Sequence, residues 1–342
     1  MKPILSFNKK KRNLLNFFLF FISLFIFIII TGYIYEIISL NRGLTKYPPP
    51  GDFVEVDGQK IHVNSTGEND VNVVILTGSG SFSADWMKIQ KEVSNFARVI
   101  TYDRPGYGWS SEHKTSRTSD QVVKELDSIL SAKNVKGPII LVGHSLGGLY
   151  AQYYQDKHPD QVSGMILVDS RPPEFSNILP LVSKEMDKMA SSQTNMGMLL
   201  SRIGVVRLLT NSMTPDYVPE EIRDIRNAIG YQSKVFKAME DEAKYIQDLE
   251  SKISDLPPIG DLPLTVISHG KEVFFLNPDD LDGEVKNEAE QVPQVWNELQ
   301  EKTANRSSNS SLLIAKNSGH DIMLEEPEIV VESIRNMVEL IQ

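Results

Sequence analysis

The stretch Leu141-Val-Gly-His-Ser-Leu-Gly-Gly-Leu-Tyr150 decides the fold, because it joins an apolar strand to a helix through one tight turn. Residues 138–142 form the short apolar run that is typical of a strand buried in a parallel sheet. Residues 146–157 have a helical pattern that a proline ends two residues later. The glycines two residues before and after Ser145 let the two backbones approach where side chains would collide. The sequence therefore predicts that Ser145 lies on a strained turn between a strand and a helix.

Patterns typical of strands and helices alternate along the chain from about residue 51. Strand patterns cover a hairpin at 53–63 and the runs 71–77, 98–103, 138–142, 163–169, 264–269 and 311–315. Helical patterns cover 85–96, 118–133, 146–157, about 287–304 and 327–341. This alternation predicts a mostly parallel sheet with helices on both faces.

Residues 172–260 interrupt this alternation. They contain no strand pattern and hold six of the eleven methionines. A helical insertion between two strands is a candidate lid, and its methionines would give the lid an adaptable apolar wall.

The composition excludes several classes of protein. The chain has 342 residues and no cysteine, which excludes disulfides, thiolate metal sites and a cysteine nucleophile. The formal net charge is −10, and because residues 1–36 carry +4, the remainder carries −14. An acidic globular part argues against nucleic acid as a partner.

The N-terminal segment predicts a membrane anchor. Residues 13–35 are uncharged and rich in Phe, Ile and Leu, and as a helix they would span the hydrocarbon core of about 30 Å. Basic residues precede them, so the N-terminus is expected in the cytoplasm and the rest of the chain outside a cell membrane crossed once. A cleaved signal peptide, and hence a secreted protein, is the alternative. The predicted parts are a basic tail (1–12), a transmembrane helix in the lipid bilayer (13–35), a proline-stiffened linker (36–50) and one domain (51–342) with its insertion at about 172–260.

Ser145 is the candidate nucleophile. Residues 143–147 fit the G-x-S-x-G motif, in which a serine is exposed on a strand-to-helix turn. A serine hydroxyl needs a base to take its proton, and a third group must hold that base. Among the six histidines, His320 lies in a loop after a predicted strand, and such loops form the site in open α/β sheets. His269, at the end of another predicted strand, is the alternative base.

From about residue 51 to its end the chain resembles the α/β-hydrolase superfamily. Four blocks carry the resemblance in matching order and spacing: Leu76–Trp86, Tyr102–Ser110, Val142–Gly148 and Ser318–Pro327. The resemblance implies an eight-stranded, mostly parallel α/β sheet with a helical lid. It also implies a site whose chain order is Ser, acid, His, which Ser145 and His320 satisfy.

The resemblance also implies an oxyanion hole made of two backbone N–H groups. One is that of Leu146, directly after the nucleophile, and the other is that of Ser79. The family's His-Gly-x sequence is replaced here by Thr77-Gly78-Ser79. A backbone donor tolerates this replacement, because the N–H group and not the side chain holds the oxyanion.

The acid is the least determined member of the site. Most members of the superfamily carry it in the loop after the seventh strand, but residues 269–280 have no aspartate in the usual place. A minority, notably some haloalkane-dehalogenase relatives, place it at the end of the sixth strand, where this chain has Asp169. Asp279 and Asp280 remain alternatives.

Together these residues predict a hydrolase without a cofactor or metal. It would cleave a small-molecule acyl substrate, an ester in preference to an amide or thioester, through an acyl-enzyme. An aminopeptidase or amidase resembling proline iminopeptidases is the alternative enzyme. A catalytically silent, membrane-anchored binding module is the alternative from another class.

Overall fold

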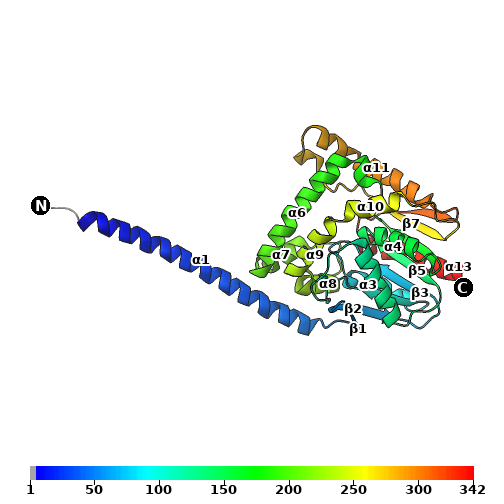
Figure 1. Ribbon diagram of the computed structural model, residues 1–342, viewed down its shortest axis with the longest axis horizontal. Helices are drawn as coiled ribbons and strands as arrows, with labels where there is room; N and C mark the ends of the chain where they lie inside the picture. The colour runs from blue at the N-terminus through cyan, green and yellow to red at the C-terminus, as the bar shows by residue number, and fades with distance from the viewer. Residues whose placement is uncertain (1–4) are drawn as a thin grey trace.

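The computed structural model describes residues 5–342, so the first four residues of the predicted tail lie outside it (Figure 1). Eight strands form one sheet in the order β1-β2-β4-β3-β5-β6-β7-β8. β2 pairs antiparallel with β1 and β4, and every other pair of neighbouring strands is parallel. The predicted eight-stranded, mostly parallel sheet is thereby confirmed. The strands are β1 (Asp52–Val56), β2 (Gln59–Thr66), β3 (Asn72–Leu76), β4 (Arg98–Tyr102), β5 (Ile139–His144), β6 (Val162–Val168), β7 (Leu264–His269) and β8 (Ser310–Ala315).

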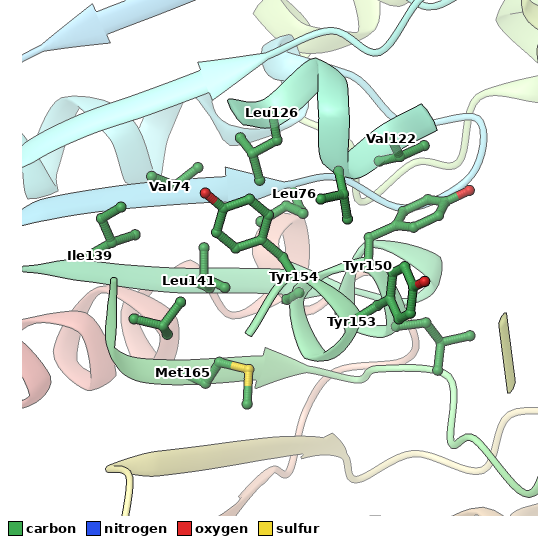
Figure 2. Packing of buried hydrophobic residues seen from close by; sticks show 14 of the residues in the cluster. Val74, Leu76, Val122, Leu126, Ile139, Leu141, Tyr150, Tyr153, Tyr154 and Met165 are labelled. Carbon is green, nitrogen blue, oxygen red and sulfur yellow. The ribbon is translucent and has the colours of Figure 1, made fainter. Parts of the chain in front are cut away.

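Helices cover both faces of this sheet, because alternate residues of its central strands point to opposite sides. Val74, Leu141 and Met165 lie side by side on β3, β5 and β6 and pack against Leu126 and Tyr154 (Figure 2). Helices α3 (Ser119–Ala132), α4 (Leu146–Lys157) and α10 (Ile246–Ser254) contribute to this core. The intervening strand residues pack against α2 (Met87–Val93) and α13 (Pro327–Ile341) on the other face.

The insertion between β6 and β7 is helical. It comprises α5 (Phe175–Ile178), α6 (Pro180–Arg202), α7 (Val205–Met213), α8 (Glu220–Ile225), the π-helical turn η2 (Arg226–Gly230), α9 (Ser233–Ala243) and α10. The rest of the chain adds η1 (Ser83–Trp86), η3 (Pro278–Asp280), α11 (Gly283–Ala304) and α12 (Ile322–Glu325). Ion pairs tie the insertion to the loops that follow the strands: Arg226 of η2 pairs with Asp85, and Glu242 of α9 pairs with Arg104.

The N-terminal segment is a single long helix, α1 (Leu5–Lys46), whose first part projects away from the body (Figure 1). It contains one span that is long and apolar enough to cross a membrane, with a mean hydropathy of 2.8. The segment 36–50, expected as an extended linker, is instead helical as far as Lys46. The proline run begins only at residue 48, and residues 36–46 pack against the insertion through Glu36 and Gly43.

Candidate active site

Ser145 lies on the turn between β5 and α4, with backbone angles φ +52° and ψ −122°. A positive φ is strained for a serine, so the surrounding packing must hold it. The flanking glycines make this packing possible. A Cβ on Gly147 would lie 2.1 Å from the backbone oxygen of Leu76, and one on Gly143 would lie 2.6 Å from Cα of Gly148. The turn therefore has the strained form that its sequence predicts.

His320 and Asp169 meet although 151 residues separate them. Asp169 directly follows β6 and is fully buried, and His320 lies in the loop between β8 and α12. His320 Nδ1 is 2.5 Å from Asp169 Oδ2. Because a carboxylate only accepts, Nδ1 carries the proton, which leaves Nε2 as the basic nitrogen of the ring.

The electrostatics of this pair favour an ionised Asp169. Burial raises the pKa of the Asp169 carboxyl, but hydrogen bonds from His269 and His320 outweigh burial and hold the pKa well below its usual range. For His320, burial lowers the pKa, while the hydrogen bond and charge of Asp169 outweigh it and raise the pKa above its ordinary value. The carboxylate is thus placed to stabilise an imidazolium at His320.

Asp169 has two further partners that the sequence patterns do not reveal. His269 Nδ1 lies 2.8 Å from Oδ2, and Trp296 Nε1 of α11 donates to Oδ1 over 2.9 Å. The ring of His269 stacks on Trp296, with an interplanar angle of 30°. His269, the alternative base in the sequence analysis, therefore contacts the acid.

Asp169, His269 and His320 also form a possible set of metal ligands, since one ligand atom from each lies within 4.8 Å of the others. In the structure both imidazole Nδ1 atoms are at hydrogen-bond distance from the carboxylate. The arrangement is that of one acceptor holding two donors, and each Nδ1 that serves as a donor is not free to bind a metal.

Asp279 and Asp280, the alternative acids, lie elsewhere. They are in η3, where neither aspartate is buried. Asp279 forms a long ion pair of 3.7 Å with Lys286, and Asp280 accepts from the Asn277 side chain. The described residues show no contact between either aspartate and His320.

The two expected oxyanion donors flank Ser145. Leu146 begins α4, whose N-terminal N–H groups carry the positive end of the helix dipole. Ser79 lies in the loop after β3. This loop runs close to the nucleophile, because a Cβ on Gly78 would lie 3.2 Å from Ser145 Cβ. Both backbone groups are therefore near the place where an oxyanion would form.

Ser145, His320 and Ser79 line one cavity of about 270 Å³. The insertion supplies its opposite wall through η2 and α9, including Phe236 and Met239. A larger hollow of about 950 Å³, at Asp70 and Arg98 among others, lies at the amino ends of the strands. Sites of open α/β sheets form at the carboxyl ends, so the smaller cavity is the candidate active site.

The cavity contains both signs of charge. Arg226 lines it and is held by Asp85, with Nε 2.6 Å from Oδ1. Asp321 also lines it and accepts a 2.6 Å hydrogen bond from the Tyr217 hydroxyl. Burial raises the pKa of Asp321, but the charge of His144 and the Tyr217 hydrogen bond outweigh burial, so the net pKa is lowered. The apolar part of the wall comes from α9 of the insertion, through Val235, Phe236 and Met239.

His144, the residue directly before the nucleophile, holds the loop of His320. Its Nε2 lies 2.9 Å from the backbone oxygen of His320. Burial, together with the nearby charge of His320, lowers the pKa of His144 to about 4. A neutral His144 can therefore donate to this carbonyl near neutral pH, which positions the loop.

A buried ion pair joins the insertion to the oxyanion loop. Arg104 binds both carboxylate oxygens of Glu242, at 2.7 and 3.2 Å. The same guanidinium donates to the backbone oxygens of Thr77 and Gly78. Arg104 belongs to a sequence block that signals the fold, but its partner lies 138 residues away and no local pattern marks it.

Comparison with known proteins agrees with this topology. A family model described as "alpha/beta hydrolase fold" matches residues 71–201. The chain is 26% identical to the protein YqjL of Bacillus subtilis over 278 residues, which are 80% of this chain and 87% of that protein. It is 25% identical to YbdG of the same organism over 72% of this chain and 76% of that protein.

Two solved structures share the arrangement of the elements. A thermophilic esterase from Thermogutta terrifontis superposes with a TM-score of 0.58 at 20% identity, covering 84% of this chain and 97% of the esterase. An esterase from Exiguobacterium antarcticum gives a TM-score of 0.59 at 18% identity, covering 84% of this chain and 99% of that protein. At these identities the likeness concerns the fold.

Proposed function

We propose that this chain, which has the α/β-hydrolase fold, is a serine hydrolase that cleaves a carboxylic ester through an acyl-enzyme. One observation carries the proposal. His320 Nδ1 lies 2.5 Å from the buried Asp169, and the same histidine lines the cavity that contains Ser145. A nucleophile, a base and an acid that orients the base are thereby present together.

In the proposed first step, His320 Nε2 takes the proton of the Ser145 hydroxyl while Oγ bonds to the ester carbonyl carbon. The carbonyl electron pair moves onto oxygen, which the N–H groups of Leu146 and Ser79 hold. As the tetrahedral intermediate collapses, His320 gives its proton to the departing alkoxide. The products are an alcohol and an acyl ester of Ser145.

In the second step, water replaces the alcohol. His320 removes a proton from water, the hydroxide oxygen bonds to the acyl carbon, and the intermediate releases the Ser145 oxygen. His320 then returns the proton to Ser145, and the carboxylic acid leaves. In both steps Asp169 fixes the tautomer of His320 and stabilises its protonated form.

The ester is preferred over the peptide substrate of the alternative enzyme. An aminopeptidase needs a free carboxylate to bind the substrate amine. Glu242, a buried carboxylate of the insertion, is already bound by Arg104 and by the Tyr107 hydroxyl. Asp321 faces the cavity and is the one observation that favours an amine, but its carboxylate already accepts the Tyr217 hydroxyl, and the guanidinium of Arg226 lines the same cavity. A silent binding module would have no use for the strained Ser145 turn.

We further propose that residues 13–35 of α1 anchor the protein in a membrane, with the N-terminus in the cytoplasm and the domain outside. The basic residues before the span support this orientation. Continuity of α1 through residue 35, and its packing against the insertion at Glu36, support a permanent anchor over a cleaved signal peptide.

The experiment uses full-length protein in detergent micelles, assayed with p-nitrophenyl esters of increasing chain length and with aminoacyl p-nitroanilides. A fluorophosphonate probe should label the wild type and not Ser145→Ala, and hydrolysis of the esters should exceed that of the anilides. Ester turnover that persists in Ser145→Ala would overturn the proposal. Preferential hydrolysis of the anilides would favour the aminopeptidase.

A further inference from the structure

α1 packs tightly against the insertion at a defined point of its length. A Cβ on Gly32 would lie 2.3 Å from the backbone oxygen of Ile203, at the junction of α6 and α7. One turn later, Arg207 of α7 donates to both carboxylate oxygens of Glu36, each over 2.7 Å. Arg207 also donates to the backbone oxygen of Ala228 in η2. The insertion is therefore joined to α1 by backbone contact and by a largely buried ion pair.

The position of this contact sets the depth of the insertion relative to a membrane. The uncharged segment begins at residue 13, and the helix rises about 1.5 Å per residue, so Gly32 lies roughly 30 Å further along. That length is the thickness of the hydrocarbon core. If residues 13–35 span a membrane as proposed, the junction of α6 and α7 lies at its surface.

The insertion has an exposed apolar surface at this level. On α6, Met189, Met196 and Leu199 are exposed and lie on one face that leads to Ile203. On α7, Leu208 and Leu209 are 70% and 50% exposed, directly after the arginine that binds Glu36. In Figure 1, α6 runs across the direction of α1, on the side of the body from which the N-terminal part of α1 departs. We call these five side chains the lid apolar surface.

This surface is one helical layer from the cavity. A Cβ on Gly197 of α6 would lie 2.4 Å from the ring of Phe236, so α6 packs directly on a residue of the cavity wall. On the adjoining side, a Cβ on Gly43 of α1 would lie 3.0 Å from the backbone oxygen of Ala228, two residues before Gly230 of the same wall. The cavity wall formed by the insertion thus lies between Ser145 and the level of the membrane.

We propose that the lid apolar surface inserts into the lipid leaflet beside α1, and that the site takes long-chain esters dissolved in that leaflet. The occupant is the bilayer because the surface adjoins α1 at the depth where the hydrocarbon ends. Exposing large apolar side chains such as Leu208 to water costs free energy, which burial in the leaflet would remove. The substrate class rests on the proposed hydrolase function, whereas the insertion into the leaflet rests on the proposed membrane anchor alone.

Insertion is tested on the full-length chain in phosphatidylcholine vesicles. The chain has no cysteine, so Leu199→Cys, Leu208→Cys and Leu340→Cys each carry a single label. Leu340 is the matched control, a leucine 63% exposed near the C-terminus. An environment-sensitive fluorophore at residues 199 and 208 should shift to the blue and be quenched by nitroxide lipids, and the label at residue 340 should do neither. Equal, water-like emission at all three positions would overturn the proposal.

The substrate class is tested with the paired change Leu208→Gln and Leu209→Gln, and with Leu340→Gln as control. The pair should lower the hydrolysis of a long-chain ester in vesicles at least about fivefold. Hydrolysis of the water-soluble p-nitrophenyl acetate should be unchanged in both variants. The substrate class would be refuted if Leu340→Gln lost as much vesicle activity as the pair, or if neither variant lost any. If wild type hydrolyses neither ester, the hydrolase proposal fails, and the fluorescence result still decides insertion.

Discussion

His269 Nδ1 lies 2.8 Å from Oδ2 of Asp169, on the carboxylate that also holds His320. With the indole of Trp296, three ring N–H groups converge on one buried acid. A carboxylate that accepts several hydrogen bonds stays ionised despite burial. His269 therefore acts on the proposed chemistry through Asp169, as a positioning residue.

Replacing His269 by alanine should lower kcat about 10-fold while KM changes little, because a hydrogen bond to a buried charge is lost. The acidic limb of the pH–rate profile should also shift, since a less firmly held carboxylate stabilises the His320 imidazolium less. His269→Asn, which keeps a donor, should recover much of the activity. A merely structural role would instead lower the melting temperature and leave the pH profile in place.

Asp169→Asn should reduce kcat by about 10⁴, the effect of losing the orienting acid in a protease triad. The paired change Asp279→Asn with Asp280→Asn should have little effect, because both side chains lie at the surface and contact neither His320 nor Ser145. Steady-state kinetics on a p-nitrophenyl ester compares the two proteins. Loss of activity in the pair, with Asp169→Asn active, would assign the acid to the loop after β7.

The pH dependence of kcat/KM should follow His320. The proposed base works only when neutral, so activity should fall as the pH drops through its pKa, which Asp169 raises above the ordinary value. The residual activity of Asp169→Asn should show this limb at lower pH, because the imidazolium loses its partner. A limb unchanged in that variant would mean that another group controls it.

Glu242→Gln should destabilise the domain by about 3–5 kcal/mol, because it leaves the guanidinium of Arg104 buried without a counter-charge. Thermal or urea unfolding measures this effect. Glu240→Gln on the same helix is the control. Its carboxylate is partly exposed and makes only a 3.8 Å ion pair with Lys244, so its effect should be within about 1 kcal/mol. Similar stabilities for the two variants would show that the buried pair is not needed.

The membrane orientation predicts accessibility from outside the cell. Protease added to intact cells or spheroplasts should release a fragment of nearly the whole domain from residue 47 onward. A domain that is protected until the cells are lysed would reverse the orientation. A mature N-terminus located after about residue 30 would favour signal cleavage.

Much of the sheet could be predicted from local patterns, because buried parallel strands are short apolar runs such as residues 138–142 and the glycines around Ser145 mark its turn. His320 could be identified as the candidate base because its loop directly follows β8. The partner of His320 was harder to assign, since Asp169 is 151 residues away and strand-end aspartates are common at turns. Their roles in catalysis remain predictions that the experiments above address.

Contacts across the fold account for what the patterns did not predict. His269 and Trp296 bind Asp169 only because the fold brings β7 and α11 close to the end of β6. No spacing of residues in the sequence indicates these contacts. The end of α1 was placed too early for a related reason. Residues 36–46 gain stability as a helix by packing on the insertion, whereas the sequence shows only a short mixed segment of polar and apolar residues before a proline run.

Three of the contacts that α1 makes with the insertion lie on the same side of the helix. Gly32, Glu36 and Gly43 are separated by four and seven residues, so they fall on a single stripe. Removing or adding one residue between Gly32 and Gly43 would turn one end of the stripe by about 100° relative to the other. Substitutions on the outer side of this segment leave the stripe intact. Related chains that keep this docking should therefore conserve the length of the segment 33–42 and the acidic residue at position 36, while the residues on its outer side vary.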